Sequence, residues 1–197
     1  MELLSPAGNY RSAIASFNAG SDAIYLGGKL FSARMNADNF SDDEIVQIIQ
    51  YAHRIGRKVY VTMNTLIFQD EFVKAVNFAR FLYNNRVDGV IIQDLGLAHY
   101  LHKTMPNLIL HASTQLNCHN LQQAIALKKI GFKRVVLARE SDIKLIKEVK
   151  SIGLEVEVFV HEKLPILAVQ FHPEMDINNE FSTLLRDYFF SLLNMYK

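Results

Sequence analysis

The chain has 197 residues, half of them hydrophobic, which predicts one domain, or one and a fraction, with a substantial core. A formal net charge of +1 gives no strong electrostatic case for nucleic acid or an acidic membrane, although a neutral total can conceal a local basic patch. The single cysteine, Cys118, excludes an internal disulfide and any all-cysteine metal or iron–sulfur site within one chain.

Targeting and membrane signals are absent from the sequence. No stretch reaches the roughly 18 continuous apolar residues that a membrane span needs. Residues 1–6 have neither a basic segment nor a long apolar core, so they do not read as a signal peptide. We therefore expect a cytoplasmic protein with no membrane partner.

Short apolar runs alternate with helical patterns through the first 160 residues. We expect strands at residues 2–4, 23–27, 58–64, 89–92, 108–112, 134–138 and 155–160. We expect helices at residues 10–19, 42–55, 70–84, 95–103, 120–130 and 143–152, the second begun by a capping box of Ser41 and Glu44. Glycines 20, 56, 131 and 153 end four of these helices.

Seven strand–helix alternations predict an α/β fold with a parallel sheet and right-handed crossovers. Two closures are possible: a TIM-barrel-like (β/α) fold with outer helices that lacks its last unit, or an open doubly wound sheet. No Gly-x-Gly-x-x-Gly follows the first strand, and the regular spacing favours the barrel.

The pattern changes after His161. Residues 166–171 read as a strand, and residues 180–196 as a helix with a heavy apolar face. We therefore divide the chain into a barrel module, residues 1–161, and a strand–helix tail, residues 162–197. The tail could supply the eighth β/α unit, or its helix could pair with a second copy in a homo-oligomer.

Polar side chains follow the apolar part of most predicted strands. In parallel α/β folds the carboxyl ends of the strands form one rim, which is where such folds place their chemistry. We therefore predict a substrate-binding rim composed of Arg34, Asn64, Gln93, Asp94, His111, Ser113, Gln115, Asn117, Arg139 and Glu140. The alternatives are helix caps, an ion pair of Arg139 with Glu140, and a solvated Arg34. The residues assign no catalytic group, and the spacing of the histidines fits no compact metal-ligand motif.

Five stretches carry a family resemblance: residues 2–8 (ELLSPAG), 22–27 (DAIYLG), 31–34 (FSAR), 111–117 (HASTQLN) and 136–140 (VLARE). Through them the chain resembles the collagenase-like peptidases of peptidase family U-32. The resemblance implies a barrel-like N-terminal domain. It also implies a peptidase-type hydrolase, or an enzyme of tRNA, rRNA or quinone hydroxylation, the last with an iron–sulfur cluster. The substrate would be a peptide, an RNA or a small molecule.

The family signature begins Glu-x-Phe-x-x-Gly and continues into a segment that bears cysteine. Glu157 and Phe159 match it, but Glu162 stands where the glycine belongs and no cysteine follows. We therefore expect no iron–sulfur ligands and little or no activity from this chain.

The tail carries a second resemblance. Its VQFHPE, residues 169–174, resembles the C-terminal end of a class I glutamine amidotransferase, in which the histidine is the base and the glutamate orients it. The Gly-x-Cys-x-Gly nucleophile turn of that family is absent. The simplest interpretation is a chimeric or truncated chain with a junction near Glu162. A non-catalytic scaffold closed by the tail strand and an amidotransferase fragment remain as alternatives.

Overall fold

The computed structural model describes residues 2–33 and 39–158 and contains one parallel sheet of seven strands. The strands are β1 (Leu4–Ala7), β2 (Ala23–Gly27), β3 (Lys58–Met63), β4 (Gly89–Ile92), β5 (Leu110–Ala112), β6 (Arg134–Val136) and β7 (Glu155–Glu157). The α-helices are α1 (Tyr10–Asn18), α2 (Asp42–Arg54), α3 (Phe72–Asn84), α4 (Leu95–Thr104), α5 (Leu121–Ile130) and α6 (Ile143–Ser151).

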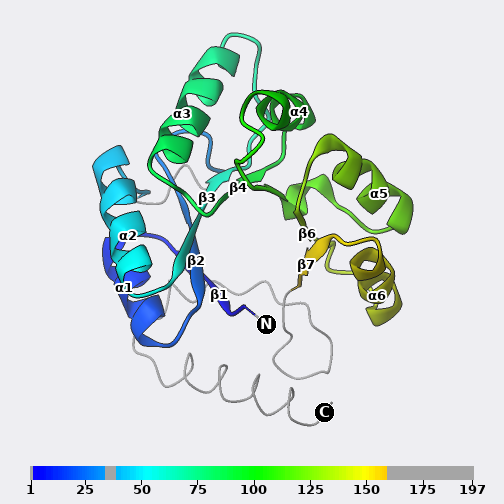
Figure 1. Ribbon diagram of the computed structural model, residues 1–197, viewed down its shortest axis with the longest axis horizontal. Coiled ribbons are helices and arrows are strands. Elements are labelled where there is room, and N and C mark those ends of the chain that lie inside the picture. The colour runs from blue at the N-terminus through cyan, green and yellow to red at the C-terminus, as the bar shows by residue number, and fades with distance from the viewer. Residues whose placement is uncertain (1, 34–38, 159–197) are drawn as a thin grey trace.

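The strands lie side by side in the order in which they occur in the chain, each parallel to the next. Figure 1 shows them curling about a common centre, with the helices on the outside. A doubly wound sheet would reverse its strand order partway, so the sequential order excludes that alternative. The predicted TIM-barrel-like fold is confirmed as a curled half-barrel.

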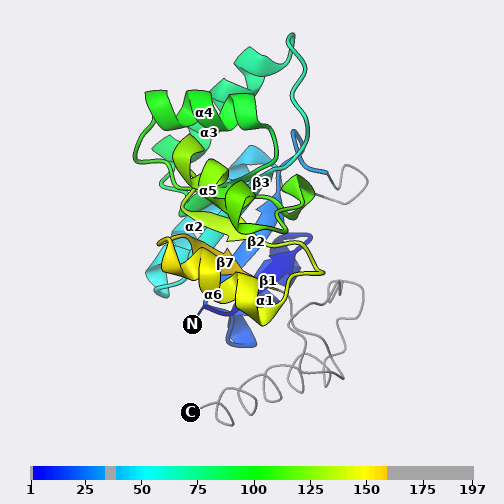
Figure 2. The ribbon, with the colours of Figure 1, turned by 90° about the vertical axis from the view of Figure 1, so that its right-hand side faces the viewer.

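Strand starts and strand ends lie on opposite faces of this half-barrel. Figure 2 shows the first described residues at one end of the barrel axis and the connection after β2 at the other. We call these the strand-start face and the strand-end rim. Among the described residues, the predicted rim residues other than His111, which lies within β5, follow the strands. The helices end and the strands begin at the opposite face.

The first strand differs from its predicted position. We expected a strand at residues 2–4 and a turn at Ser5 and Pro6, but β1 runs through Pro6, which lies opposite Tyr25 of β2. Proline lacks an N–H group and is tolerated at the edge of a sheet. The turn therefore begins only at Gly8.

Several helices begin or end at capping residues that the sequence predicts. The hydroxyl of Ser41 accepts a hydrogen bond from the Glu44 amide, and the Glu44 carboxylate accepts one from the Ser41 amide at 2.8 Å. Gly20, Gly56, Gly131 and Gly153 have positive φ at the ends of α1, α2, α5 and α6. These caps fix where each helix starts and stops.

Two apolar layers stabilise the fold. The larger lies between sheet and helices, where Ile24, Val61 and Ile92 are fully buried against helix residues such as Ile45 and Leu101. The smaller lies inside the curl and consists of Ala23, Tyr60 and Ile91, with Leu4 and Tyr25 packed on it. The interior is therefore filled by side chains, as in complete barrels of this type.

Two predictions fall on residues that the structure does not describe. The expected tail, with its strand at 166–171 and its helix at 180–196, lies outside the described residues, as does Arg34. Among the residues that are described, no helix combines the length and the apolar character needed to cross a membrane.

Candidate functional site

Two of the predicted rim residues hold the loops of the rim in place. Oδ1 of Asn64 accepts a 3.1 Å hydrogen bond from the Ala33 amide. Asp94 caps α4 by accepting a 2.7 Å hydrogen bond from the Leu97 amide, and its other oxygen accepts one from the Ile67 amide at 3.3 Å. Asp94 therefore has the capping role that was the alternative to substrate binding, and it also ties the β3–α3 loop to α4.

The segment after β5 forms a short 3-10 turn, Thr114–Leu116. Ser113 is buried at its start, and its hydroxyl accepts a 3.2 Å hydrogen bond from the Gln115 amide. Asn117 ends the turn with a positive φ of 49°, and its carbonyl contacts Nδ1 of His119 at 2.8 Å. The side chains of Gln115 and Asn117 are exposed at the rim.

Three further rim residues are free of partners among the described residues. Gln93 is half-buried directly after β4, and Arg139 and Glu140 are exposed in the turn after β6. The ion pair of Arg139 with Glu140, which was the alternative to a binding role, does not form in the part of the chain that the structure describes. These three side chains, with Gln115 and Asn117, are the rim groups available to a ligand.

His111 does not lie at the rim. It is 2% exposed and lies inside the curl, where its ring meets that of Tyr60 edge to face at 4.6 Å between centroids. Its Nδ1 is buried and has no hydrogen-bond partner in residues 2–33 and 39–158. Burial, helped by the positive charge of Arg134, lowers the pKa of His111 to about 3, so the imidazole is neutral at physiological pH.

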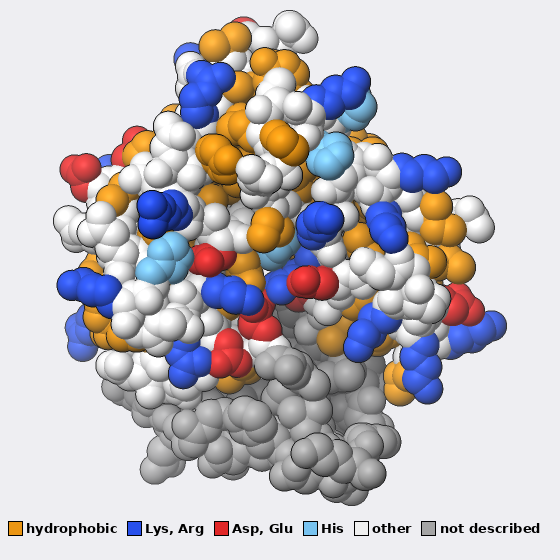
Figure 3. Space-filling view, in the orientation of Figure 1, with side chains coloured by type: hydrophobic (Ala, Val, Ile, Leu, Met, Phe, Trp, Pro, Cys, Tyr) orange, Lys and Arg blue, Asp and Glu red, His pale blue; other side chains and the backbone are white. Residues whose placement is uncertain are grey.

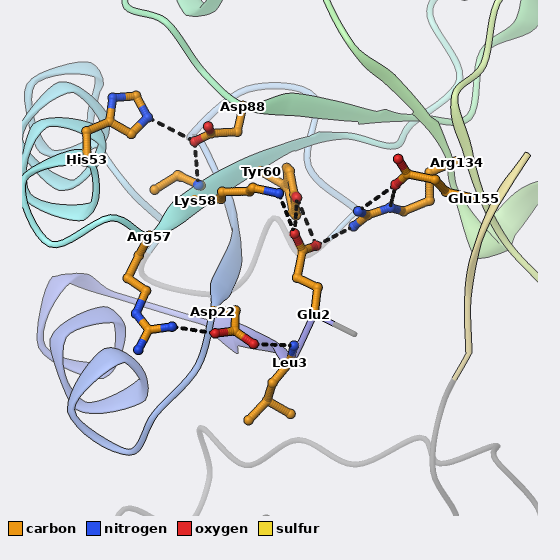
Figure 4. A network of polar contacts seen from close by, with 11 residues as sticks. Glu2, Leu3, Asp22, His53, Arg57, Lys58, Tyr60, Asp88, Arg134 and Glu155 are labelled. Carbon is orange, nitrogen blue, oxygen red and sulfur yellow. Dashed lines mark hydrogen bonds and ion pairs between the residues drawn. The ribbon is translucent and has the colours of Figure 1, made fainter. Parts of the chain in front are cut away.

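A charged network that the sequence did not reveal lies at the strand-start face. Glu2 is at its centre, and Figure 4 shows Lys58, Tyr60 and Arg134 converging on its carboxylate. The three donors lie 2.8, 2.8 and 2.7 Å from the carboxylate oxygens. Nε and Nη2 of Arg134 also donate to Glu155, at 3.0 and 2.8 Å.

Electrostatics in this network follow from burial and pairing. Burial raises the pKa of Glu2, but the hydrogen bonds from Lys58, Arg134 and Tyr60 outweigh it and lower the pKa to about 2. Burial raises the pKa of the Tyr60 hydroxyl, so it remains a proton donor. Arg134 also stacks over the Tyr60 ring, 5.1 Å from its centroid.

The pKa of Glu157 is shifted in the opposite direction to that of Glu2. Its Oε2 is buried and has no hydrogen-bond partner among the described residues, and burial raises the pKa of Glu157 to about 7. Burial thus disfavours the charged form of both interior groups, Glu157 and His111.

One signal could have indicated this network. Lys58, Arg134 and Glu155 are charged residues at the first position of short strands that are otherwise apolar or half-buried. Adjacent parallel strands in register bring such positions together, and Arg134 pairs with Glu155 in the observed register. We had considered only the polar residues at the other ends of the strands.

The described residues do not assemble a nucleophile. Ser113 is a buried cap, and the thiol of Cys118 is fully buried with its pKa raised by that burial. No group of three or more histidine, cysteine or acidic side chains in the described part of the chain is placed to hold a metal ion. An iron–sulfur cluster held by thiolates alone does not fit this chain, because its one cysteine cannot supply a set of thiolate ligands.

Comparisons with known proteins identify the family. The family described as peptidase family U32 matches residues 8–169, past the predicted junction near Glu162. The 23S rRNA 5-hydroxycytidine C2501 synthase of Escherichia coli K12 is 38% identical over 165 residues, which are 83% of this chain and 25% of that protein. The tRNA hydroxylation protein P1 of Bacillus subtilis is 34% identical over 161 residues, 81% of this chain and 38% of that protein.

A third relative is named as an uncharacterized protease of Methanocaldococcus jannaschii. It is 36% identical over 170 residues, which cover 83% of this chain and 41% of that protein. The solved structure of the U32 peptidase Mk0906 has a TM-score of 0.67 at 15% identity and covers 96% of this chain and 76% of that one, a likeness of fold. The chain thus spans a quarter to two fifths of the length of these three curated relatives, and it belongs to peptidase family U32.

Proposed function

We propose that this chain is the barrel module of a U32 protein that takes part in the hydroxylation of a pyrimidine in RNA. The supporting observation is its 34–38% identity, across most of the barrel, to proteins named for rRNA and tRNA hydroxylation. The module would hold the substrate, and the remainder of a full-length relative would supply what this chain lacks. On this proposal the chain alone has little or no turnover.

The strand-end rim is the proposed place for the base that is modified. Gln93, Gln115, Asn117 and Arg139 offer amide and guanidinium groups whose hydrogen-bonding capacity is not used by the described part of the chain. Such groups can recognise the edge of an unpaired base and a neighbouring phosphate. Arg34 belongs to the same proposed set by its sequence position, whereas Asn64, Asp94 and Ser113 position the loops.

A peptidase is the alternative that the family name suggests. The contacts within the described residues argue against it, because the Ser113 hydroxyl serves as a turn cap and the Cys118 thiol is buried with a raised pKa. The same thiol gives no support to glutamine hydrolysis, and the amidotransferase-like tail stays a prediction. A non-catalytic scaffold remains the competing proposal.

Chimeras would test the proposal. Escherichia coli K12 also has a tRNA hydroxylation protein P, which is 30% identical to this chain over 165 residues. In a strain that lacks this protein and the 23S rRNA synthase, the matched segment of either one is replaced by residues 2–158. Mass spectrometry of RNA digests then measures 5-hydroxycytidine and hydroxylated uridine. We expect one chimera to restore its nucleoside, and the unfused chain to restore neither.

A matched swap controls for the grafting itself. The corresponding segment of the Haemophilus influenzae tRNA hydroxylation protein P, placed in the Escherichia coli protein, should support modification. If that chimera works while soluble, folded chimeras with this barrel leave both RNAs unmodified, the RNA-hydroxylation proposal is wrong and the scaffold interpretation takes its place.

A further inference from the structure

Charge is distributed unevenly between the two ends of the barrel. We define the strand-start face as the residues before β1, the last three residues of each helix, the connection that follows, and the first residue of the next strand. This face holds ten lysines and arginines against four carboxylates. Figure 3 looks onto it and shows basic side chains around its circumference. The near-neutral net charge of the chain conceals this patch.

The four carboxylates of the strand-start face are all engaged. Glu2 binds Lys58 and Arg134, and Glu155 also binds Arg134. Asp22 pairs with Arg57, and Asp88 accepts hydrogen bonds from the Val59 amide and contacts His53. None of these carboxylates is left to neutralise the remaining cations.

Six cations of the face are left over. They are exposed and have no ion-pair or hydrogen-bond partner in the described part of the chain: Arg54, Arg86, Lys103, Lys129, Lys133 and Lys150. Helix ends also point at this face, and each contributes about half a negative charge. Six helices therefore offset about three of the six surplus charges, so the face stays clearly positive.

The opposite rim has the reverse balance. From the end of each strand to the first three residues of the next helix, the described residues hold five lysines and arginines against eight carboxylates. The N-terminal ends of the six helices offset these three excess negative charges, so the rim is close to neutral. A polyanion that approaches the barrel is therefore attracted to the strand-start face rather than to the rim. The charge distribution favours binding of a polyanion at the strand-start face.

An open groove in the basic face is lined by two of the six surplus cations. It has a volume of about 510 Å³, lies between the ends of α2 and α3, and is lined by Arg54, Arg86 and the amides of Gln50, Asn84 and Asn85. Guanidinium groups bind phosphate through paired hydrogen bonds, and side-chain amides add donors for phosphate and sugar oxygens. A sugar-phosphate unit fits this chemistry.

The backbone at Arg86 supports a role for its side chain. Arg86 has a φ of 61° after α3, whereas the residues with positive φ after α1, α2, α5 and α6 are glycines. An L side chain in this left-handed conformation costs about 1 kcal/mol or more relative to glycine. The chain carries that strain at the one such helix end where the residue lines the groove.

We propose that the strand-start face binds the sugar-phosphate backbone of RNA, with one phosphate in the groove between Arg54 and Arg86. The inference rests on the proposed function for the choice of RNA as the polyanion. It adds a docking surface on the face opposite the rim. The module would bind the RNA backbone at the strand-start face, while a separate part of the same RNA reaches the base-modifying centre.

Binding of an unmodified tRNA transcript to the full chain tests the proposal. Fluorescence anisotropy across a salt series should show a Kd that weakens steeply with salt. In the variant Arg54→Glu with Arg86→Glu, affinity should fall about tenfold or more and the salt slope should decrease by about two. A second pair on the same face, Lys129→Glu with Lys133→Glu, should show a similar loss.

A matched control changes the same charge at the rim. Lys29→Glu with Lys74→Glu should bind as tightly as the unaltered chain, and thermal unfolding checks that all variants are folded. The proposed docking face would be overturned if the rim control lost as much affinity as the face variants, or if both face variants bound tRNA as tightly as the unaltered chain. Binding to phosphatidylserine vesicles without binding to tRNA would also overturn it. Binding that depends on the face while both chimeras stay inactive would overturn the hydroxylation proposal alone.

Discussion

Glu2 and Arg134 lie 132 positions apart in the chain, yet Nη1 of Arg134 donates a 2.7 Å hydrogen bond to Oε1 of Glu2. Glu2 precedes β1 at one end of the sheet, and Arg134 begins β6 near the other end. Because β1 and β7 are the outermost strands, this pair bridges the interior of the curl rather than two adjacent strands. The contact therefore stabilises the curvature of the sheet directly.

Removing the cation should destabilise the fold strongly. Arg134 is the partner of both Glu2 and Glu155, and its side chain is only 12% exposed. We expect Arg134→Met to lower the free energy of unfolding by about 3 kcal/mol, because Glu2 would be left half-buried with fewer partners. Urea denaturation measures the loss. A matched control, Arg139→Met in the exposed turn, should change stability by less than about 0.5 kcal/mol.

Acid should weaken the same network. The pKa of Glu2 is about 2 in the folded chain against 4.5 for a free side chain. A depressed carboxyl pKa gives stability that is present above pH 4.5 and lost as pH falls toward 2. The contribution is about 3 kcal/mol. Glu2→Gln should flatten the acid limb of stability against pH, and an unchanged limb would contradict the pairing described here.

The two interior groups should give opposite pH slopes. His111 has a depressed pKa, so its contribution is present above pH 6.5 and lost as pH falls toward 3. Glu157 has a raised pKa, so its contribution is present below pH 4.5 and lost as pH rises through about 7. The free energy of unfolding is measured at a series of pH values. We expect His111→Phe to remove the loss of stability on acidification and Glu157→Gln to remove the loss as pH rises. Identical pH profiles for the two variants would show that these side chains are hydrated.

Much of the fold was predictable because local signals and the global architecture agree. The alternation of apolar runs with capped helices predicted a parallel sheet and favoured the barrel, and the Ser41–Glu44 capping box is present as expected. The end of β1 was not predictable from its residues, because Pro6 ordinarily marks a turn. Only its place at the edge of the sheet makes a strand possible there.

The position of His111 in the structure differs from the predicted one. Its position near the end of an apolar run indicated a rim residue, but β5 begins only at Leu110 and turns the imidazole into the interior. The Glu2 network was missed because its members come from four strand starts. Sequence spacing alone does not report contacts between residues more than a hundred positions apart.

The imidazole ring of His111 should exclude any residue larger than glycine at position 89. A Cβ added at Gly89 would lie 3.1 Å from Nε2 of His111 and 3.3 Å from the Ile109 carbonyl oxygen. We expect Gly89→Ala to cost about 1 to 3 kcal/mol, since both neighbours are held by the sheet. In a His111→Ala background the added cost should shrink by about 1 kcal/mol, because the ring is gone. Additive losses in this double-mutant cycle would show that the backbone contact dominates.

Variants of the remaining predicted rim residues should fall into two groups, those that lower stability and those that lower only activity. Asp94 caps α4 and holds Ile67, so Asp94→Ala should lower the free energy of unfolding by about 1 kcal/mol or more. Gln93 and Arg139 make no such contacts within the described residues, so Gln93→Ala and Arg139→Ala should leave stability unchanged. In whichever chimera modifies its RNA, these two variants should reduce hydroxylation about tenfold or more, because they would orient the substrate. Full hydroxylation by both would remove Gln93 and Arg139 from the proposed site and leave the strand-end rim as loop structure alone.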